Sequence, residues 1–304
     1  MSFLSGCQGS PPPCCQGGLV RWADVPQCIS TGSRLPGLLG AGTVLKYKKL
    51  PETIKESYQK TERKNIKDSC FSYIVMSMRV VPTGVDVFDV LLGGGYSAGI
   101  TTFYGPRGVG KTTVCIMSAQ AVLAAGKKVI YISTENISPV VRMTQIDEGN
   151  KKLLSHLLFF TPETFEEQTA ICEKLRRTTE RSIGMVIVDS IAPLYRLRRA
   201  EQPDIEGAIR ELGRQMAYLT DLSRKMEIPI LITTQVYADI EKQDAIKMVG
   251  GEILHYGSTC LIELQKRAHN LRRAILEKHP SVPQGNSVVF TLCEKGIVSR
   301  TGKE

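Results

Sequence analysis

The stretch that decides the fold is Gly105-Pro106-Arg107-Gly108-Val109-Gly110-Lys111-Thr112-Thr113. It fits the phosphate-loop pattern G-x-x-x-x-G-K-[ST], and it lies where that pattern requires, after the apolar run Ile100–Tyr104 and at the start of a predicted helix. The glycines let the backbone wrap closely round a phosphate group, so that successive N–H groups and the helix N-terminus point at negative charge. A chance glycine-rich turn would not need this strand-to-helix setting. The stretch therefore predicts a nucleotide site, with all nine residues as candidate contacts.

Two side chains of this loop carry the predicted chemistry. The ammonium group of Lys111 can neutralise the β- and γ-phosphates of a nucleotide, and the hydroxyl of Thr112 can ligate Mg²⁺. Both residues follow the last glycine, at the point where the helix begins. The expected ligands are therefore a nucleotide and Mg²⁺.

Polar residues close three further apolar runs. Asp189 ends Met185–Asp189 and could hold the water shell of Mg²⁺. Glu135 follows Val129–Ser133, where a carboxylate can polarise a hydrolytic water. Gln235 closes another apolar run, and its amide can sense a γ-phosphate. Each residue also has a plain structural reading, as a strand-end or loop residue, so the three assignments depend on the phosphate loop.

Apolar, β-branched runs and helical stretches alternate along the chain from residue 76. The runs that predict strands are Ile100–Tyr104, Val129–Ser133, Leu157–Phe160, Met185–Asp189 and Pro229–Val236. The stretches that predict helices are Thr112–Ala125, Pro162–Arg181 and Glu206–Met226. Such strands with helical crossovers predict a mostly parallel sheet with helices on both faces. The last runs, Thr259–Gln265, Arg272–Glu277 and Ser287–Cys293, predict an antiparallel extension at one edge.

The composition is that of a globular protein, with 42% hydrophobic and 23% charged residues in a chain of 304. No run of about 18 apolar residues exists, which excludes a membrane-spanning helix. The first residues lack the basic and apolar regions of a secretory signal, so we expect a cytoplasmic protein. Four cysteines stand singly in apolar surroundings and are expected to be buried: Cys115, Cys172, Cys260 and Cys293.

Residues 1–75 differ from the rest of the chain. They hold 10 Lys and Arg against 5 Asp and Glu, so over half of the net charge of +9 lies in this quarter. Five cysteines lie there too, without the paired C-x-x-C spacing of a zinc site. Pro11-Pro12-Pro13 and scattered Gly and Ser show no sustained period. We expect a disordered tail or a mis-called start, with Met76 or Met78 as the initiator; a basic arm that adds affinity for DNA is the alternative.

Several motifs follow one another in the order and spacing of a known superfamily. They are Thr83-Gly84-Val85-Asp86 with Leu91-Leu92-Gly93-Gly94-Gly95, the phosphate loop, Thr134-Glu135, Val188-Asp189-Ser190 with Leu194-Tyr195-Arg196, Glu211–Met216, Thr234-Gln235-Val236 and Gly250-Gly251. The core of the chain, residues 76–304, thereby resembles the ATPase core of the RecA/RadA recombinase superfamily, and within it the archaeal RadB family. The resemblance implies ATP and Mg²⁺ as cofactors, Asp189 as the Walker B acid, Glu135 as catalytic base and Gln235 as sensor. It also implies an ATP site that a neighbouring subunit completes in part.

Three departures bear on the activity. Strand-exchange members of the superfamily carry a helix-hairpin-helix domain and an F-x-x-A polymerisation motif; neither is visible in residues 1–75, and RadB proteins lack both. Ser133 stands where the superfamily usually has Asp. The stretch that matches the second DNA loop, Ala238–Met248, has a net charge of −1 and no aromatic residue, so it makes a poor cradle for single-stranded DNA. The resemblance thus implies a weak ATPase that does not exchange strands on its own.

Basic residues that could contact DNA gather at two places. The predicted hairpin near the C-terminus carries Lys266, Arg267, Arg272, Arg273 and Lys278, and the stretch that matches the first DNA loop carries Arg196, Arg198 and Arg199. Phosphate contacts by such side chains would give affinity without reading bases. A solvated hairpin is the alternative for the first group. Lys278 has one more alternative, because the matching stretch in the superfamily caps ATP held by the neighbouring subunit.

Two functions fit these residues. The first is an accessory protein of DNA repair and homologous recombination that binds ATP and DNA, single-stranded or branched. Its expected partners are a RadA-type recombinase, a Holliday junction resolvase and further copies of the same chain. The second is a signalling ATPase of the KaiC-like kind, which acts on protein partners without DNA. Fold alone cannot decide between the two functions. Three sequence features favour the first: the single core, Gly250-Gly251 and the basic hairpin.

Overall fold

The computed structural model describes residues 80–135, 138–146, 148–201, 204–238, 246–268 and 270–299. All of them belong to one compact unit of the chain, Tyr73–Glu304. Residues 1–75, with the expected domain boundary near Val75, lie outside the described residues. His269 also lies outside them. So do residues 239–245, and these seven make up most of the stretch that matches the second DNA loop.

One nine-stranded sheet organises the described part of the chain, in the order β11-β10-β9-β8-β1-β5-β4-β2-β3. The strands are β1 (Gly99–Tyr104), β2 (Lys128–Ser133), β3 (Leu157–Phe160), β4 (Ile183–Asp189), β5 (Pro229–Thr234), β8 (Cys260–Lys266), β9 (Leu271–Lys278), β10 (Ser287–Cys293) and β11 (Gly296–Ser299). The six strands from β8 to β3 run parallel, whereas β9, β10 and β11 pair antiparallel. The predicted fold class, a mostly parallel sheet with an antiparallel C-terminal extension, is confirmed.

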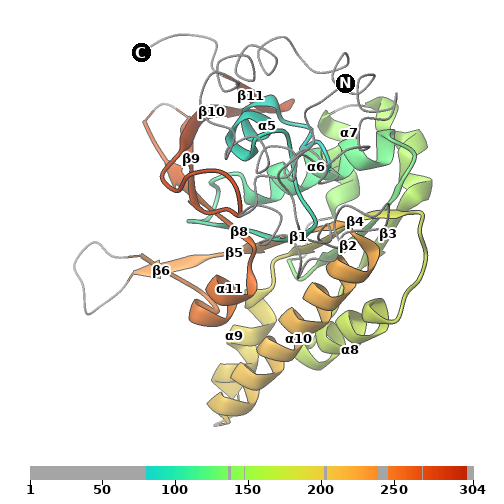
Figure 1. Ribbon diagram of the computed structural model, residues 1–304, viewed down its shortest axis with the longest axis vertical. Coiled ribbons are helices and arrows are strands. Elements are labelled where there is room, and N and C mark those ends of the chain that lie inside the picture. Colours follow the sequence, from blue (N-terminus) through green and yellow to red (C-terminus); the bar gives the residue numbers. More distant parts are fainter. Residues whose placement is uncertain are drawn as a thin grey trace, which may run out of the picture. The chain divides into compact units, whose positions relative to one another are not determined.

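Helices cover both faces of this sheet (Figure 1). One face carries α5 (Asp86–Leu92), α6 (Lys111–Ala124), α7 (Pro139–Ile146) and the 3₁₀ helix η3 (Glu148–His156); the other carries α8 (Phe165–Arg176), α9 (Ala192–Glu201), α10 (Ile205–Met226) and α11 (Gly251–Gly257). Each face has its own hydrophobic cluster, because successive side chains of a strand point to opposite sides. In β5, Leu231 packs with the α6 face while Ile230 and Ile232 pack with the α10 face.

Two predicted elements were too long. The helix predicted over Pro162–Arg181 is α8 alone, because Thr164 caps its start: the Thr164 hydroxyl accepts the N–H of Glu167 at 3.1 Å. The strand predicted over Pro229–Val236 ends at Thr234. There the Thr234 hydroxyl donates to the Val249 carbonyl at 2.9 Å. The chain then forms a separate two-stranded ribbon, in which β6 (Val236–Ala238) pairs with β7 (Ile246–Met248). Gln235 therefore lies between the sheet and this ribbon.

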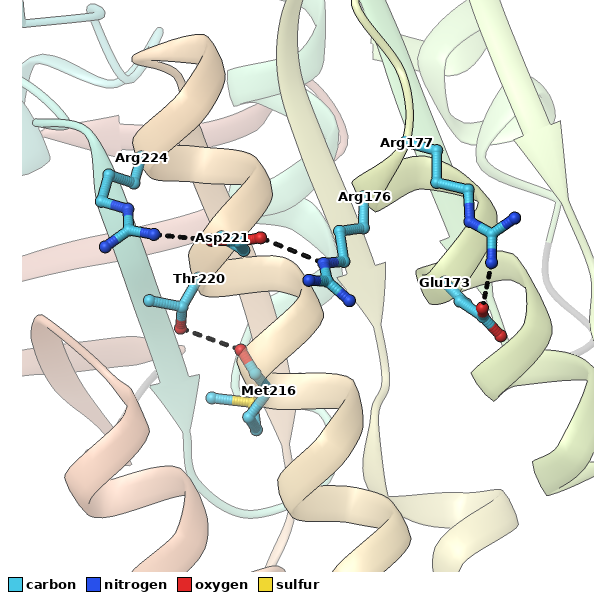
Figure 2. A network of polar contacts seen from close by, with 7 residues as sticks. All are labelled: Glu173, Arg176, Arg177, Met216, Thr220, Asp221 and Arg224. Atoms are coloured by element: carbon cyan, nitrogen blue, oxygen red, sulfur yellow. Dashed lines mark hydrogen bonds and ion pairs between the residues drawn. The ribbon is translucent and has the colours of Figure 1, made fainter.

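Helices α8 and α10 are joined at their exposed side by a cluster of ion pairs (Figure 2). The carboxylate of Asp221 in α10 accepts from Arg176 of α8 at 3.0 Å and from Arg224 of α10 at 2.7 Å. Exposed pairs of this kind each contribute roughly 0–1 kcal/mol, so the cluster adds little to the stability of the helix pair. The stronger connection is inside: the Gln168 amide donates to Gln215 Oε1 at 2.6 Å, and both glutamines are fully buried.

The remaining described elements were not predicted from the sequence: α5, α7, η3, α9, α11, β6, β7 and β11. All of them are ten residues long or shorter, and such short segments show little periodicity. Cys115, Cys172 and Cys260 are buried as expected, but Cys293 is exposed because it ends β10 at the turn to β11. Among the described residues no helix is long and apolar enough to cross a membrane.

Candidate functional site

The phosphate loop runs from the end of β1 to the start of α6, as the pattern predicts. Its glycines have left-handed backbones, with φ of 152° at Gly105, 72° at Gly108 and 107° at Gly110. A side chain at position 105 would place its Cβ 2.2 Å from the Leu264 carbonyl oxygen of β8, so only glycine lets the two backbones lie this close. This is a cradle of bare backbone, which fits a bound phosphate chain.

Lys111 is held inside this loop. Its side chain is 8% exposed, and Nζ donates to the carbonyl of Gly105 at 2.8 Å and to that of Pro106 at 2.9 Å. Burial lowers the pKa of Lys111, while the carboxylates of Asp189 and Glu135 raise it in part. The two predicted acids therefore lie close enough to act on the loop lysine. Within the described residues the hydrogen-bond partners of Lys111 are these two carbonyls, and a buried cation of this kind is well suited to receive an anionic phosphate.

Asp189 ends β4 with both carboxylate oxygens occupied by hydroxyl donors. Tyr131 of β2 donates to Oδ2 at 2.7 Å, and Thr233 of β5 donates to Oδ1 at 2.5 Å. Burial, together with the charge of Asp189, raises the pKa of Tyr131, so its hydroxyl keeps the proton that it donates. These bonds fix the direction of a carboxylate that is 6% exposed. Thr112 is a half-buried residue in the first turn of α6, and its hydroxyl is, like the Asp189 carboxylate, a hard oxygen ligand of the kind that Mg²⁺ prefers.

Glu135 and Gln235 are brought into direct contact, although 100 residues separate them. The Gln235 amide donates to Glu135 Oε1 at 3.2 Å. The loop that carries Glu135 is tied down by its neighbours, because Ser133 Oγ donates to the Glu135 carbonyl at 2.7 Å and Thr134 Oγ1 donates to the Ser190 carbonyl at 2.6 Å. Ser133 stands where the superfamily usually has Asp, and here its hydroxyl makes a hydrogen bond to the backbone.

A surface cavity of about 380 Å³ opens beside Gln235. It is lined by residues of the first half of α9 and by Gln235: Ala192, Pro193, Arg196, Leu197 and Gln235. The stretch expected to match a DNA loop is therefore helical here, and only Arg196 of its three arginines lines the cavity. Arg198 forms an ion pair with Glu166 at 2.8 Å, and Arg199 lies over the Tyr195 ring at 5.6 Å. The charge of Arg198 is thus already matched within the protein.

The basic hairpin β8–β9 does not present its charges alike. Lys266 and Arg267 are exposed at the turn, whereas Arg272 and Arg273 are half-buried. Arg273 donates to Ser287 Oγ at 2.9 Å, and Arg272 Nε is buried without a partner in the described structure. Lys278 lies at the other end of β9, where Nζ donates to the His255 carbonyl at 3.1 Å, in the last turn of α11. The helix dipole favours a cation there, so Lys278 has a structural partner.

The structure also assigns supporting roles that the sequence reasoning missed. Tyr131 and Thr233 lie inside apolar strands, and their hydroxyls find Asp189 only because β2 and β5 flank β4 in the sheet. The buried Gln168 is the third: its amide also reaches the Ile191 carbonyl at 3.3 Å, two residues after Asp189. A polar residue inside an apolar run was the available signal, but strand order was needed to interpret it.

Comparisons with known proteins agree with this geometry. The sequence model of the Rad51 family matches residues 75–300. The DNA repair and recombination protein RadB of Methanoculleus marisnigri is 41% identical over 222 residues, 71% of this chain and 96% of its own length. The chain belongs to the RadB group of the Rad51 family. RadB of Methanococcoides burtonii is 36% identical over 211 residues, 69% of this chain and 93% of that protein.

A solved structure extends the likeness to three dimensions. The crystal structure of the RadB recombinase superposes with a TM-score of 0.62 at 35% identity, and the match covers 72% of this chain and 99% of that one. The resemblance stated from the motifs is thereby confirmed.

Proposed function

We propose that this RadB-group chain binds ATP with Mg²⁺, hydrolyses it slowly, and assists DNA repair and recombination in the cytoplasm without exchanging strands itself. The observation that carries the proposal is the hydrogen bond from Gln235 to Glu135. Gln235 touches the candidate base on one side and lines the cavity beside α9 on the other. The relatives named for DNA repair and recombination support this function over the signalling ATPase.

The nucleotide would be held by the backbone of the phosphate loop and by Lys111. The loop N–H groups would donate to the phosphates, and Lys111 would exchange its two carbonyl partners for phosphate oxygens. Thr112 and Asp189 would hold the metal ion. When bound, Mg²⁺ supplies positive charge to the β- and γ-phosphates. Because Tyr131 and Thr233 fix its direction, Asp189 needs no rearrangement to serve this role.

Glu135 would act as the general base. Its Oε1 accepts the Gln235 amide, which leaves Oε2 to take a proton from the attacking water. Gln235 orients this carboxylate, so a shift of Gln235 would move the base. An ATPase whose base depends on a residue outside the phosphate loop is expected to be slow until that residue is correctly placed.

DNA would be bound through its phosphates by the β8–β9 hairpin and by Arg196 beside the cavity. Arg267, Arg272 and Arg273 carry the proposed hairpin contacts, and single-stranded and branched DNA both offer the phosphates that they need. Arg198 and Lys278, with their internal partners, are weaker candidates than the sequence suggested. A RadA-type recombinase, a Holliday junction resolvase and further copies of the chain are the proposed protein partners.

The test is the ATPase rate of the full chain, measured alone, with single-stranded DNA, and with DNA plus a cognate RadA-type recombinase. We expect a slow basal rate that DNA raises. Gln235→Ala should keep the affinity for ATP but lose the stimulation by DNA, because only the link between cavity and base is removed. A wild-type chain that fails to retain labelled DNA on a filter at low salt would contradict the recombination role and favour the signalling ATPase.

A further inference from the structure

Lys266 is exposed at the end of β8, yet it lies beside the phosphate loop. Strands β1 and β8 are parallel neighbours with Tyr104 opposite Glu263. Beyond that pair β8 continues along the loop, and the contact of Gly105 with the Leu264 carbonyl shows how closely the two backbones run. A chain that keeps this register brings Lys266, the last residue of β8, level with the middle of the loop.

The alternation of β8 sets the side on which Lys266 emerges. Cys260, Ile262 and Leu264 all pack into the cluster under α6, so Lys266, two residues further on, has the same orientation. Its ammonium group lies 3.8 Å from the place that a Cβ on Gly108 would occupy. Glu263 and Gln265, on the opposite side, bond to each other at 3.0 Å. Lys266 is thus separated from the polar residues of its own strand and faces the loop.

The ammonium group of Lys266 lies close enough to Lys111 to affect its pKa. Burial is the main cause that lowers the pKa of Lys111, and the nearby ammonium of Lys266 lowers it further. Among the described residues Lys266 forms no ion pair. Two ammonium groups held near each other repel, and a polyanion between or beside both relieves that repulsion.

We propose that Lys266 is a second cation for the phosphates of the nucleotide, supplied by the same chain that carries the phosphate loop. The ligand class is a nucleoside di- or triphosphate, because a chain of phosphates can reach from Lys111 to the side of the loop near Gly108. The inference deepens the proposed function and rests on its nucleotide binding. It also divides the basic hairpin: Lys266 serves the nucleotide, and the arginines beyond it serve DNA.

The experiment measures the affinity of the full-length chain for fluorescent ADP and ATP analogues and, without nucleotide, for single-stranded DNA. Lys266→Ala should weaken both nucleotides about tenfold, as expected for one charge-assisted hydrogen bond of about 1.4 kcal/mol. Lys266→Arg, which keeps the charge, should recover most of that loss, and DNA affinity should change less than about twofold by the same free-energy scale. Lys225→Ala, an equal loss of charge in the last turn of α10 on the opposite face of the sheet, should bind nucleotide as the wild type does.

Unchanged nucleotide affinity of Lys266→Ala overturns the inference, and so does a loss confined to DNA. A Lys111→Ala variant measured in parallel separates the two levels. If Lys111→Ala loses nucleotide binding while Lys266→Ala does not, only the second cation is wrong. If neither variant loses it, the phosphate-loop assignment fails as well.

Discussion

Asp189 shows how much of the candidate site is prepared by residues outside the phosphate loop. Its carboxylate is buried, and a buried charge is tolerated only when its oxygens have donors. Tyr131 and Thr233 supply them from the two neighbouring strands. The sequence predicted Asp189, Glu135 and Gln235, because polar residues at the ends of apolar strands are conspicuous. It could not predict their supporting hydroxyls, since which strands lie side by side is a long-range property.

Tyr131→Phe tests this support. It leaves Asp189 Oδ2 short of a donor, so we expect the free energy of unfolding to fall by about 1.5–3 kcal/mol, the range for a hydrogen bond to a charged group. Because the carboxylate then loses its fixed direction, ATP binding should also need more Mg²⁺. Urea denaturation and a Mg²⁺ titration of ATP binding measure the two effects.

Tyr96→Phe is the matched control for that variant. Tyr96 is equally buried, but its hydroxyl pairs with Ser118 at 3.0 Å, and Ser118 keeps a bond to the Thr83 carbonyl when the tyrosine hydroxyl is gone. We expect a loss near the neutral-bond value of about 1 kcal/mol and no change in Mg²⁺ requirement. Equal Mg²⁺ dependence of the two variants would remove Tyr131 from the metal site.

Glu135→Gln separates binding from hydrolysis. The amide keeps the size of the side chain but cannot take a proton, so ATP turnover should fall by about 10²–10⁴-fold, the usual worth of a general base. The affinity for ATP should stay within about twofold, because Glu135 contributes no phosphate contact. Single-turnover hydrolysis and nucleotide titration give the two numbers. Turnover that survives the change would move the role of base to another residue.

At the scale of elements, the hairpin β8–β9 and the helix α9 contrast in what the sequence could reveal. The hairpin was predicted almost residue for residue, because alternating apolar residues and a polar turn are local signals. Helix α9 was expected to be a DNA loop, yet Leu194 and Tyr195 are buried in the α10-side cluster, where the Tyr195 ring lies 5.9 Å from that of Phe165. Packing on a distant helix decided its structure.

The paired change Arg272→Ala and Arg273→Ala tests the hairpin as a DNA contact. Losing two phosphate contacts should make the plot of log affinity against log salt shallower by about 1.4, at about 0.7 per contact for a single strand. The loss should be similar for all DNA sequences, because phosphates carry no base information. Filter binding across a range of salt concentrations measures it.

A second pair of changes controls for charge alone. Lys174→Ala with Lys225→Ala removes two positive charges from the last turns of α8 and α10. Its salt dependence should match that of the wild type. If both pairs flatten the plot equally, the effect is one of overall charge, and the hairpin is not the contact surface.

For the molecule as a whole, the sequence predicted the class of fold but not the order of the strands in the sheet. Alternating strands and helices indicate a parallel sheet with both faces covered, since each strand run is apolar throughout. The order β1-β5-β4-β2-β3 could not be read from local patterns, because β1 pairs with a strand 130 residues away, Gly99 with Pro229. That order is what places Gln235 between the phosphate loop and Glu135.

We further propose that residues 76–304 fold without residues 1–75. All the described contacts of the site lie after residue 80, and the Rad51 family match begins at residue 75. A chain that starts at Met76 should melt within about 2 °C of the full chain, a shift that corresponds to about 0.5–1 kcal/mol for a protein of this size. It should also bind ATP equally well. Thermal unfolding and nucleotide titration of both lengths decide this, and a truncated chain that melts several degrees lower would show that residues 1–75 pack on the core.

Gly105 brings the phosphate loop into direct contact with β8, the strand that leads into the basic hairpin. With no side chain between them, the first residue of the phosphate loop rests directly on the Leu264 carbonyl of β8, and β8 runs on into the basic hairpin. Because the two backbones touch directly, a displacement of the hairpin along β8 would reach the phosphate loop without any side chain in between. Pulling on the hairpin would then change the geometry of the candidate nucleotide site even when no nucleotide is exchanged.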